Sequence, residues 1–567
     1  MSPRPTVDAA DRAGALALFA LLLALYTLTF SGLPDNPDAE VEFQSVHSLA
    51  VHHSLMLGGT PEAEAILAAN FNVAPGGPGG EDRWYAWFGV GQAFVALPFY
   101  ALGALGERLF PEVEARHRET LAYGAGRSEY WRHLAVGWRN PLLGAATAAI
   151  LLLAARRLGA SRSSALLAAL LYGTATFAWP QARSTLSDVQ GTFFLCLAFE
   201  RWLALQREDA RHFWAILWGS GAIAMAVLTR VALVPAALVI ALAFVAVLFA
   251  RRASWGQWFA FFVPAGVGAA VFALANFFRF GSVFETGYGT ALASGTFFSY
   301  PPHFGLAGIL IAPGKGLLWM APLLLLAGIG LSVARKRGER LWPWLAAAMT
   351  VAIVAPVACS QTWHGAWTYG PRYVLPLVPF LWPAVALAFD VAREHRGVFA
   401  ATIVLSGLGL ATTLPGVLVD HMTHQDLALQ AARAQWPEPG GADERERDAA
   451  RFLAIQYDWR FAAPWAHWRI AAHRLGDSGE EYSARELFGV ASDAPLRPEH
   501  DRERGWNHLA WVDLRQRLGG PAWLGPLAAL LWLCLAALAW CWRAAVLGRP
   551  EAGPGGPRPP GQGAASR

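Results

Sequence analysis

The chain has 567 residues, of which 55% are hydrophobic and 15% are charged, and its mean hydropathy is +0.33. Soluble domains carry about 25% charged residues, so this composition excludes an ordinary soluble protein and points to a lipid bilayer. The formal net charge is only +4, and no polar segment carries a basic stripe interleaved with aromatic residues, which argues against a nucleic-acid partner.

Apolar runs long enough to cross a membrane recur along the chain. The first run follows Arg4 and Arg12 without a cleavage site of small residues, so we expect an uncleaved signal anchor. The fold class predicted is an all-α polytopic membrane protein. About twelve transmembrane helices are expected, at 14–32, 140–156, 163–180, 189–205, 212–229, 231–250, 257–277, 316–334, 342–359, 373–391, 397–417 and 523–542.

Arginine positions predict how these helices are oriented. Clusters occur in every second connection, as in 156–162, 201–211, 251–252 and 334–340. The positive-inside rule puts all of them in the cytoplasm, together with both termini. If 88–103 also crossed the membrane, every later cluster would lie outside. We therefore expect 88–103 to be an interfacial or re-entrant juxtamembrane helix on the outer face.

Two outer segments are too long to be simple connections, and long loops are usually functional. The first outer loop spans 33–139. The second, 418–522, is rich in Trp, His, Arg and acids and is expected to form a small periplasmic or extracellular cap. After the last span, the Pro- and Gly-rich residues 543–567 are expected to form a disordered cytoplasmic tail.

The stretch "PDAEVEFQSVHSLA", 37–50, places three carboxylates directly after the first span. Its periodicity predicts a helix over 38–57 that lies along the outer membrane surface. A purely structural explanation is that acids in the first turn complement the helix dipole. We expect the apolar stripe to contain Phe43, Val46, Leu49 and Ala50, and Glu40, Gln44 and His47 to face away from it.

Cations reappear on the outer face, where arginine is otherwise depleted. "WPQARSTLSDVQG", 179–191, contributes Arg183, and Arg230, Lys315 and Arg372 lie at later outer turns. Each could be a solvated charge in a tight turn, and Arg183 could simply pair with Asp188. Together, they would form a binding site for a phosphate at the membrane boundary. The neighbouring residues expected at the same site are Asp188, Tyr288, His364 and Tyr369.

The order of motifs along the chain resembles that of the GT-C superfamily of integral membrane glycosyltransferases. The motifs are "PDAEVEF", "RWYAWFGVGQAFVALPFYALG", "WPQARSTLSD", "LTRVALVP", "NFFRFGSVFETGYG", "APGKGLLWMAP" and "YGPRYVLPLVPF". The likeness is strongest to bacterial relatives of the protein O-mannosyltransferases and of the lipid A aminoarabinose transferase, and it covers roughly 14–420. It implies a transmembrane catalytic domain over 1–417 in a bacterial inner (plasma) membrane.

The resemblance also implies roles for the acids of the first outer loop. Asp38 stands five residues before Phe43, as in the D-x-x-x-x-Y/F arrangement of the family, and would be the catalytic base. The family often has adjacent Asp and Glu, whereas this chain has Asp-Ala-Glu, which leaves the catalytic role of Glu40 open.

The implied reaction moves a sugar from a polyprenyl-phosphate carrier to an acceptor hydroxyl at the outer face. Asp38 would assist deprotonation, and the cations would stabilise the departing lipid phosphate. The partners would be the donor, membrane lipid and an acceptor glycan, lipid or protein. No cofactor or metal is expected, and no Walker A, G-x-S-x-G or Rossmann pattern occurs.

Two other functions would also explain the cations at the outer face. A transporter or flippase of lipid-linked cell-envelope intermediates would carry ionisable residues near mid-membrane and inverted repeats. The apolar runs contain few charges and no repeat is evident, which favours the enzyme. A scaffold that only binds glycolipid would tolerate replacement of Asp38.

Overall fold

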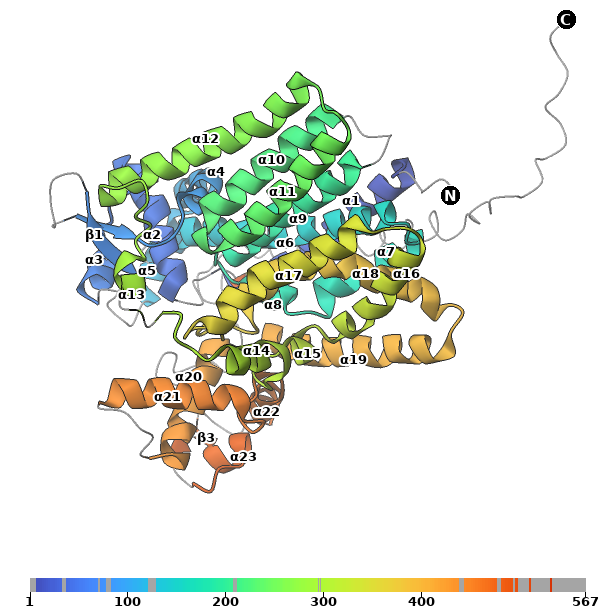
Figure 1. Ribbon diagram of the computed structural model, residues 1–567. Coiled ribbons are helices and arrows are strands. Elements are labelled where there is room, and N and C mark those ends of the chain that lie inside the picture. Colours follow the sequence, from blue (N-terminus) through green and yellow to red (C-terminus); the bar gives the residue numbers. More distant parts are fainter. Residues whose placement is uncertain are drawn as a thin grey trace, which may run out of the picture.

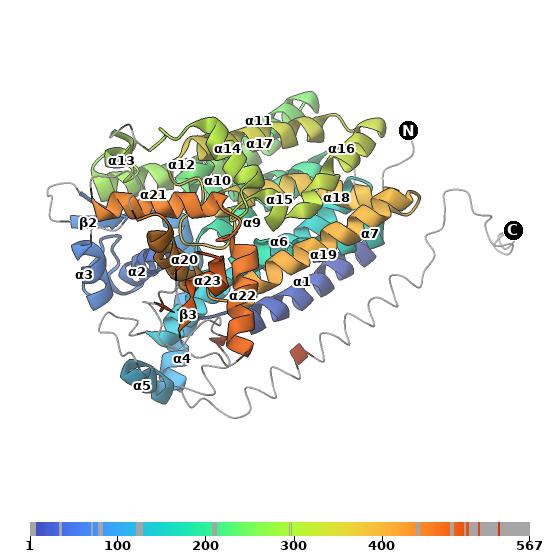
Figure 2. The same cartoon turned by 90° about the horizontal axis from the view of Figure 1, so that it is seen from below.

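The structure is a computed structural model. Its described residues are mainly helical and include two short antiparallel pairs of strands (Figures 1 and 2). The predicted all-α membrane fold is confirmed. The last predicted span, 523–542, and the tail lie outside the described residues except for positions 531 and 532. The described residues are 7–32, 37–69, 72–77, 83–120, 129–206, 212–293, 295, 297–437, 443–476, 481–492, 495–497, 509–510 and 531–532.

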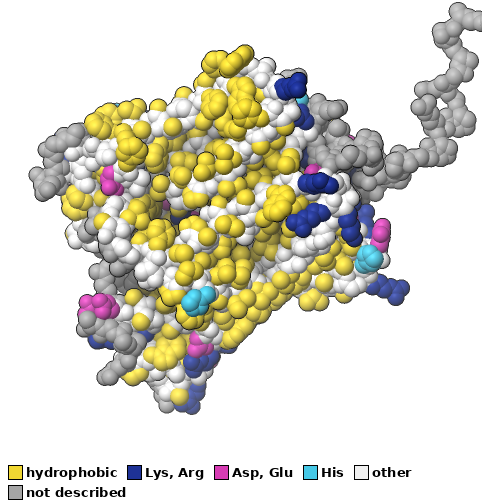
Figure 3. All heavy atoms as spheres, in the orientation of Figure 1, with side chains coloured by type: hydrophobic (Ala, Val, Ile, Leu, Met, Phe, Trp, Pro, Cys, Tyr) yellow, Lys and Arg dark blue, Asp and Glu magenta, His cyan; other side chains and the backbone are white. Residues whose placement is uncertain are grey.

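Eight helices of the described chain are long and apolar enough to cross a membrane, and each coincides with a predicted span. Their outward side chains are apolar: Trp255, Phe249 and Phe259 are 65–82% exposed, and Figure 3 shows a broad hydrophobic face. Soluble proteins rarely expose such a surface. The helices are α1 (Ala9–Thr29), α6 (Tyr130–Arg157), α10 (His212–Thr229), α11 (Val234–Ala250, after η1, Val231–Leu233), α12 (Trp255–Phe280), α17 (Leu341–Cys359), α18 (Val378–Ala392, after η3, Arg372–Leu377) and α19 (Arg396–Leu418).

Three predicted spans differ from the expectation of one apolar helix each. The run 163–180 is divided into α7 (Arg162–Thr174) and α8 (Ala178–Arg183). The run 316–334 is divided into α15 (Leu317–Met320), η2 (Pro322–Leu326) and α16 (Ala327–Lys336), because Pro322 lacks the amide hydrogen that a continuous helix needs. The helix α9 (Asp188–Leu205) follows its predicted bounds closely but contains Asp188, Glu200 and Arg201.

The first outer segment contains α2 (Pro37–His52), α3 (Pro61–Ala68), β1 (Val73–Gly76), β2 (Arg83–Ala86), α4 (Val90–Leu109) and α5 (Pro111–Thr120). The two strands pair antiparallel, with Val73 opposite Ala86. Helices α4 and α5 meet at a bend of 96°, the geometry of a broken span or a re-entrant loop, and counting this pair as one span gives up to nine.

The polar face of α2 is largely covered by other parts of the protein. Gln44 and His47 are both buried. Thr60, just before α3, donates to Gln44, and His47 lies 3.1 Å from Glu129 and 3.0 Å from the Tyr100 hydroxyl. Other parts of the first outer segment and the start of α6 therefore cover this face, which helical periodicity alone does not reveal.

Arginines gather at one end of the helix bundle. Arg156 and Arg162 lie 2.8 and 3.0 Å from the Asp11 carboxylate at the start of α1, and Arg337 donates to the carbonyl of Gly159. Figure 3 shows basic side chains at this end. The turns at the other ends of α1, α9, α10 and α18 carry the predicted site residues.

The described part of the C-terminal segment has its own apolar core, to which Leu427, Ile455, Phe461 and Phe488 contribute. This C-terminal cap lies against the bundle (Figure 1), where Trp468 donates to the carbonyl of Ala411 in α19. Its elements are α20 (His421–Gln435), α21 (Glu444–Tyr457), α22 (Ala463–Leu475), β3 (Tyr482–Ser483), α23 (Ala484–Phe488) and β4 (Pro495–Leu496). Between α12 and α15 lie α13 (Gly289–Ala293) and α14 (Pro302–Ile311).

Candidate active site

Asp38 lies in the first turn of α2, and its side chain is 12% exposed. One carboxylate oxygen accepts a hydrogen bond from Arg372 at 2.6 Å, and the other accepts one from Asn72, also at 2.6 Å. Asp38 and Arg372 are 334 residues apart in the chain. The fold therefore brings the predicted base into direct contact with a predicted phosphate ligand.

Asp188 and Arg230 complete the arrangement. Arg230, between α10 and η1, lies 2.6 Å from the Asp188 carboxylate at the start of α9, and Arg372 lies 3.9 Å from the same oxygen. We call Asp38, Asp188, Arg230 and Arg372 the paired-charge cluster. Its two carboxylates balance its two guanidinium groups, which is what permits so many charges to be buried.

Aromatic residues line this cluster. The guanidinium carbons of Arg372 and Arg230 lie 4.9 and 5.3 Å from the centre of the Tyr373 ring, within the range of a cation–π interaction. Arg372 also donates to the Tyr373 hydroxyl. Tyr288 is close enough for its pKa to respond: burial raises it to about 12, and Arg230 opposes that rise.

Sequence reasoning missed Tyr373 and Asn72. Tyr373 directly follows Arg372 in "YGPRYVLP", so its position beside a predicted phosphate ligand was an available signal. Asn72 has a positive φ of 52°, a left-handed backbone conformation that Asn adopts more readily than most residues. No spacing in the sequence connects Asn72 to Asp38.

Lys315 and His364 lie near the paired-charge cluster without bonding to it. Lys315 is fully buried and donates to the carbonyls of Ala366 and Thr368. Burial, with a further contribution from Arg372, lowers the pKa of Lys315 well below its ordinary value. Burial, Lys315 and Arg372 together lower the pKa of His364 to about 3, so this imidazole is neutral.

Two predicted site residues serve other contacts. Arg183 donates to the carbonyl of Thr29 at the end of α1, and Asp188, its suggested partner, pairs with Arg230 instead. The hydroxyl of Tyr369 donates to the carbonyl of Thr412 in α19. Among the described contacts, Arg183 thus bonds to the end of α1 and Tyr369 to α19.

The other two acids of α2 have separate surroundings. Glu40 accepts from Gln44 and lies 3.1 Å from His133. Glu42 is buried, accepts from the Ser187 hydroxyl at 2.6 Å and lies 3.7 Å from Arg139. Burial raises the pKa of Glu42 to about 7, although Arg139 and Ser187 oppose the rise. A small cavity borders Glu42, His133 and Arg139.

The carboxylates of the paired-charge cluster are bonded to arginines. Within the described chain, the His, Cys, Asp or Glu side chains close enough to share a metal ion are His421, His424 and His467, in the C-terminal cap. Fold and site together define a multi-pass membrane protein whose buried ion-pair network lies at the end of the bundle opposite the arginine-rich end.

No protein-family model matches this sequence, and no curated protein matches it. The solved structures that share a low overall similarity with this chain include two proteins of different organisms. ArnT from Cupriavidus metallidurans bound to undecaprenyl phosphate has a TM-score of 0.43 and 14% identity, over 94% of this chain and 76% of that one. The Archaeoglobus fulgidus oligosaccharyltransferase tethered to an acceptor peptide has a TM-score of 0.39 and 12% identity, over 77% of this chain and 59% of that one.

At such identities and TM-scores, the likeness assigns no role to any residue. The chemistry has to be derived from the side chains of this chain.

Proposed function

We propose that the chain is a membrane glycosyltransferase that moves a sugar from a polyprenyl-phosphate carrier to an acceptor hydroxyl at the outer face of the membrane. The observation that carries the proposal is the contact between Asp38 and Arg372 within a cluster that also contains Arg230. A candidate base and two candidate phosphate ligands thus lie together at one end of the membrane helices.

The reaction needs both a base and cationic phosphate ligands. As the acceptor oxygen attacks the anomeric carbon, its proton passes to the Asp38 carboxylate. The bond between that carbon and the phosphate oxygen breaks, and the electron pair leaves with the polyprenyl phosphate. Arg372 and Arg230 stabilise this leaving group, because a planar guanidinium donates two parallel hydrogen bonds to phosphate oxygens. Lys315 adds positive charge when protonated.

Donor binding would also prepare the base. Arg372 donates to Asp38 through one nitrogen, and its Nε is buried without a hydrogen-bond partner among the described residues. A phosphate that takes over this guanidinium would release the Asp38 carboxylate toward the acceptor. Glu40, two residues further along α2 and bonded to Gln44, is the second acidic candidate.

The decisive experiment is sugar transfer by purified membranes supplied with a panel of polyprenyl-phosphate sugars. Asp38→Asn keeps the shape of the side chain and removes the base, so we expect the rate for the accepted donor to fall about 10²- to 10⁴-fold. The matched control is Asp443→Asn, which changes the exposed N-cap carboxylate of α21 to another good N-cap. It should keep the wild-type rate at equal expression.

The alternative function, a transporter or flippase of lipid-linked intermediates, makes a different prediction in the same membranes. A transported donor would cross the bilayer without losing its sugar. The sugar–phosphate bond would then stay intact with the wild type and with Asp38→Asn alike. Full activity of Asp38→Asn, or no consumption of any donor, would overturn the glycosyltransferase proposal.

A further inference from the structure

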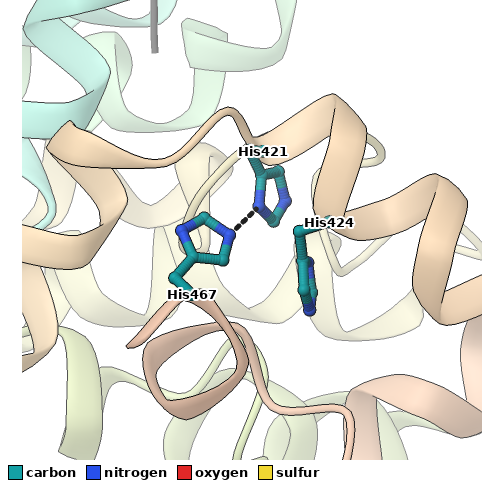
Figure 4. Close-up of side chains that lie close together, drawn as sticks. All are labelled: His421, His424 and His467. Carbon is teal, nitrogen blue, oxygen red and sulfur yellow. Dashed lines mark hydrogen bonds between the residues drawn. The ribbon is translucent and has the colours of Figure 1, made fainter. Parts of the chain in front are cut away.

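Three buried histidines meet inside the C-terminal cap, away from the paired-charge cluster. His421 and His424 are one helical turn apart at the start of α20, and His467 comes from α22 (Figure 4). One potential ligand nitrogen from each ring lies within 4.8 Å of the other two. We call these residues the histidine cluster. The residues are 0–8% exposed.

Backbone carbonyls set the proton positions on two of the rings. Nδ1 of His467 lies 3.1 Å from the carbonyl oxygen of Pro415, and Nε2 of His424 lies 3.0 Å from that of Phe461. A carbonyl only accepts, so each of these nitrogens carries a proton and donates. The other nitrogen of each ring, Nε2 of His467 and Nδ1 of His424, then has a lone pair that can accept a hydrogen bond or bind a metal ion. Histidines that bind metals are typically oriented by such a bond.

Burial keeps the imidazoles neutral, which is the form that binds a metal ion. It lowers the pKa of His421 and His424 well below the ordinary value and that of His467 to about 4. Lys315 lowers all three pKa values further and would oppose a bound cation, but burial lowers its own pKa too. Asp420, the N-cap of α20, acts on His467 in the opposite direction.

Gln425 connects the cluster and leaves one group unpaired. Its side-chain nitrogen lies 3.2 Å from Nε2 of His421 and 3.3 Å from Nδ1 of His424, while its buried oxygen has no hydrogen-bond partner among the described residues. The two ends of a Gln amide are interchangeable in such a network. With its nitrogen toward the two rings, the amide donates to Nε2 of His421 and to Nδ1 of His424. Nδ1 of His421 then carries the proton and donates to Nε2 of His467 at 3.2 Å. When a cation replaces that proton, the proton of His421 moves to Nε2, where the turned amide oxygen can accept it.

One proton lies between Nδ1 of His421 and Nε2 of His467, and a cation can take its place. Nitrogen ligands of one zinc ion lie roughly 3.4 Å apart, given Zn–N distances of about 2.1 Å, so this pair already has a suitable spacing. The nitrogen of His424, within 4.8 Å of the other two, has to move closer. Imidazole nitrogen is a preferred ligand of Zn²⁺ and of neighbouring transition metals.

We propose that His421, His424 and His467 bind one divalent transition-metal cation of the Zn²⁺ class. The site joins α20 to α22 and, through the bond from His467 to Pro415, to the end of α19. It would fix the C-terminal cap on the bundle. The proposal departs from the sequence-based expectation that no metal binds, and it does not depend on the glycosyltransferase proposal.

The test uses the full chain, purified in detergent with an affinity tag that contains no histidine. The protein is incubated with Zn²⁺ or Co²⁺, desalted and measured for bound metal by mass spectrometry and for Co²⁺ absorption in the visible range. We expect about one metal ion per chain in the wild type. His467→Ala and His424→Ala should fall to background.

His473→Ala is the matched control, because His473 is also a buried histidine of α22 but contacts Glu486 instead. It should retain the metal. If the cluster variants do not fold, the wild type alone decides: a chelator should lower its Tm and Zn²⁺ should restore it. No retained metal with an unchanged Tm, or equal loss of metal in His473→Ala, would overturn the site and leave a neutral hydrogen-bonded network.

Discussion

The paired-charge cluster and the histidine cluster are both buried polar groups, and they are stabilised in opposite ways. In the first, four charged side chains cancel one another through contacts such as those of Asp38 with Arg372 and Asp188 with Arg230. In the second, the imidazoles are neutral, and carbonyls satisfy their N–H groups. Removing one charged side chain leaves an opposite charge buried and uncompensated, whereas removing one neutral imidazole leaves no such charge.

This difference also separates the two clusters by function. Opposite charges that are buried together can exchange partners when an anion arrives, because each guanidinium has more donors than one carboxylate uses. Neutral imidazoles have no such affinity for a phosphate but do offer lone pairs to a cation. The first cluster is therefore suited to a phosphate ligand and the second to a metal ion.

The largest expected effect is the loss of Arg372. Arg372→Ala breaks the buried ion pair with Asp38 and weakens the surroundings of Asp188, and breaking a buried ion pair costs about 3–5 kcal/mol. In the metal-free protein, His467→Ala removes neutral hydrogen bonds and should cost about 1–3 kcal/mol. Thermal unfolding followed by tryptophan fluorescence in detergent measures both variants.

The rate of sugar transfer tests the role of Arg372 separately from its contribution to stability. Arg372→Lys keeps the charge but cannot donate two parallel hydrogen bonds to one phosphate, so its rate should fall even where its Tm is close to that of the wild type. Equal unfolding costs for Arg372→Ala and His467→Ala would contradict the distinction between charged and neutral clusters.

A smaller effect concerns Glu42, whose pKa burial raises to about 7 from an ordinary value of 4.5. Between these pH values the folded protein keeps a proton that the unfolded chain has released. The stability therefore falls as the pH rises from 4.5 to 7, by on the order of 3 kcal/mol in total. Glu42→Gln cannot titrate and should lack this fall.

The measurement is Tm at pH steps from 5 to 8 for the wild type and Glu42→Gln. Glu112→Gln, an exposed first-turn acid of α5, is the control and should follow the wild-type profile. Parallel profiles for the wild type and Glu42→Gln would show that Glu42 is already ionised throughout this range.

The smallest expected effect lies at the border of the histidine cluster. A Cβ at Gly416 would lie 2.6 Å from ring carbons of Tyr369, and the centre of that ring is 5.1 Å from the centre of the His467 ring. Gly416→Ala should cost about 1–3 kcal/mol through overpacking and weaken metal retention.

Gly407→Ala provides the comparison on the same helix. A Cβ at Gly407 meets no atom within 4 Å, so this substitution should leave both Tm and metal content unchanged. If both variants behave alike, the packing between α19 and the cap does not support the histidine cluster.

The spans could be predicted from the sequence because their signal, a long apolar run, is local. Long apolar runs such as 257–277 and 397–417 coincide with α12 and α19, and the arginines of the connections meet at one end of the bundle as their alternation predicted. The burial of Gln44 and His47 could not be predicted in this way, because whether a polar face is covered depends on segments far along the chain.

Sequence by itself therefore determined the membrane class, the main helices and a set of candidate cations. Only the tertiary structure decided that Asp38 contacts Arg372 while Arg183 bonds to Thr29, and that His467 joins His421 and His424. The physical reason is that hydrophobic periodicity acts within one helix, whereas pairing between distant charged or imidazole side chains depends on how the helices pack against one another.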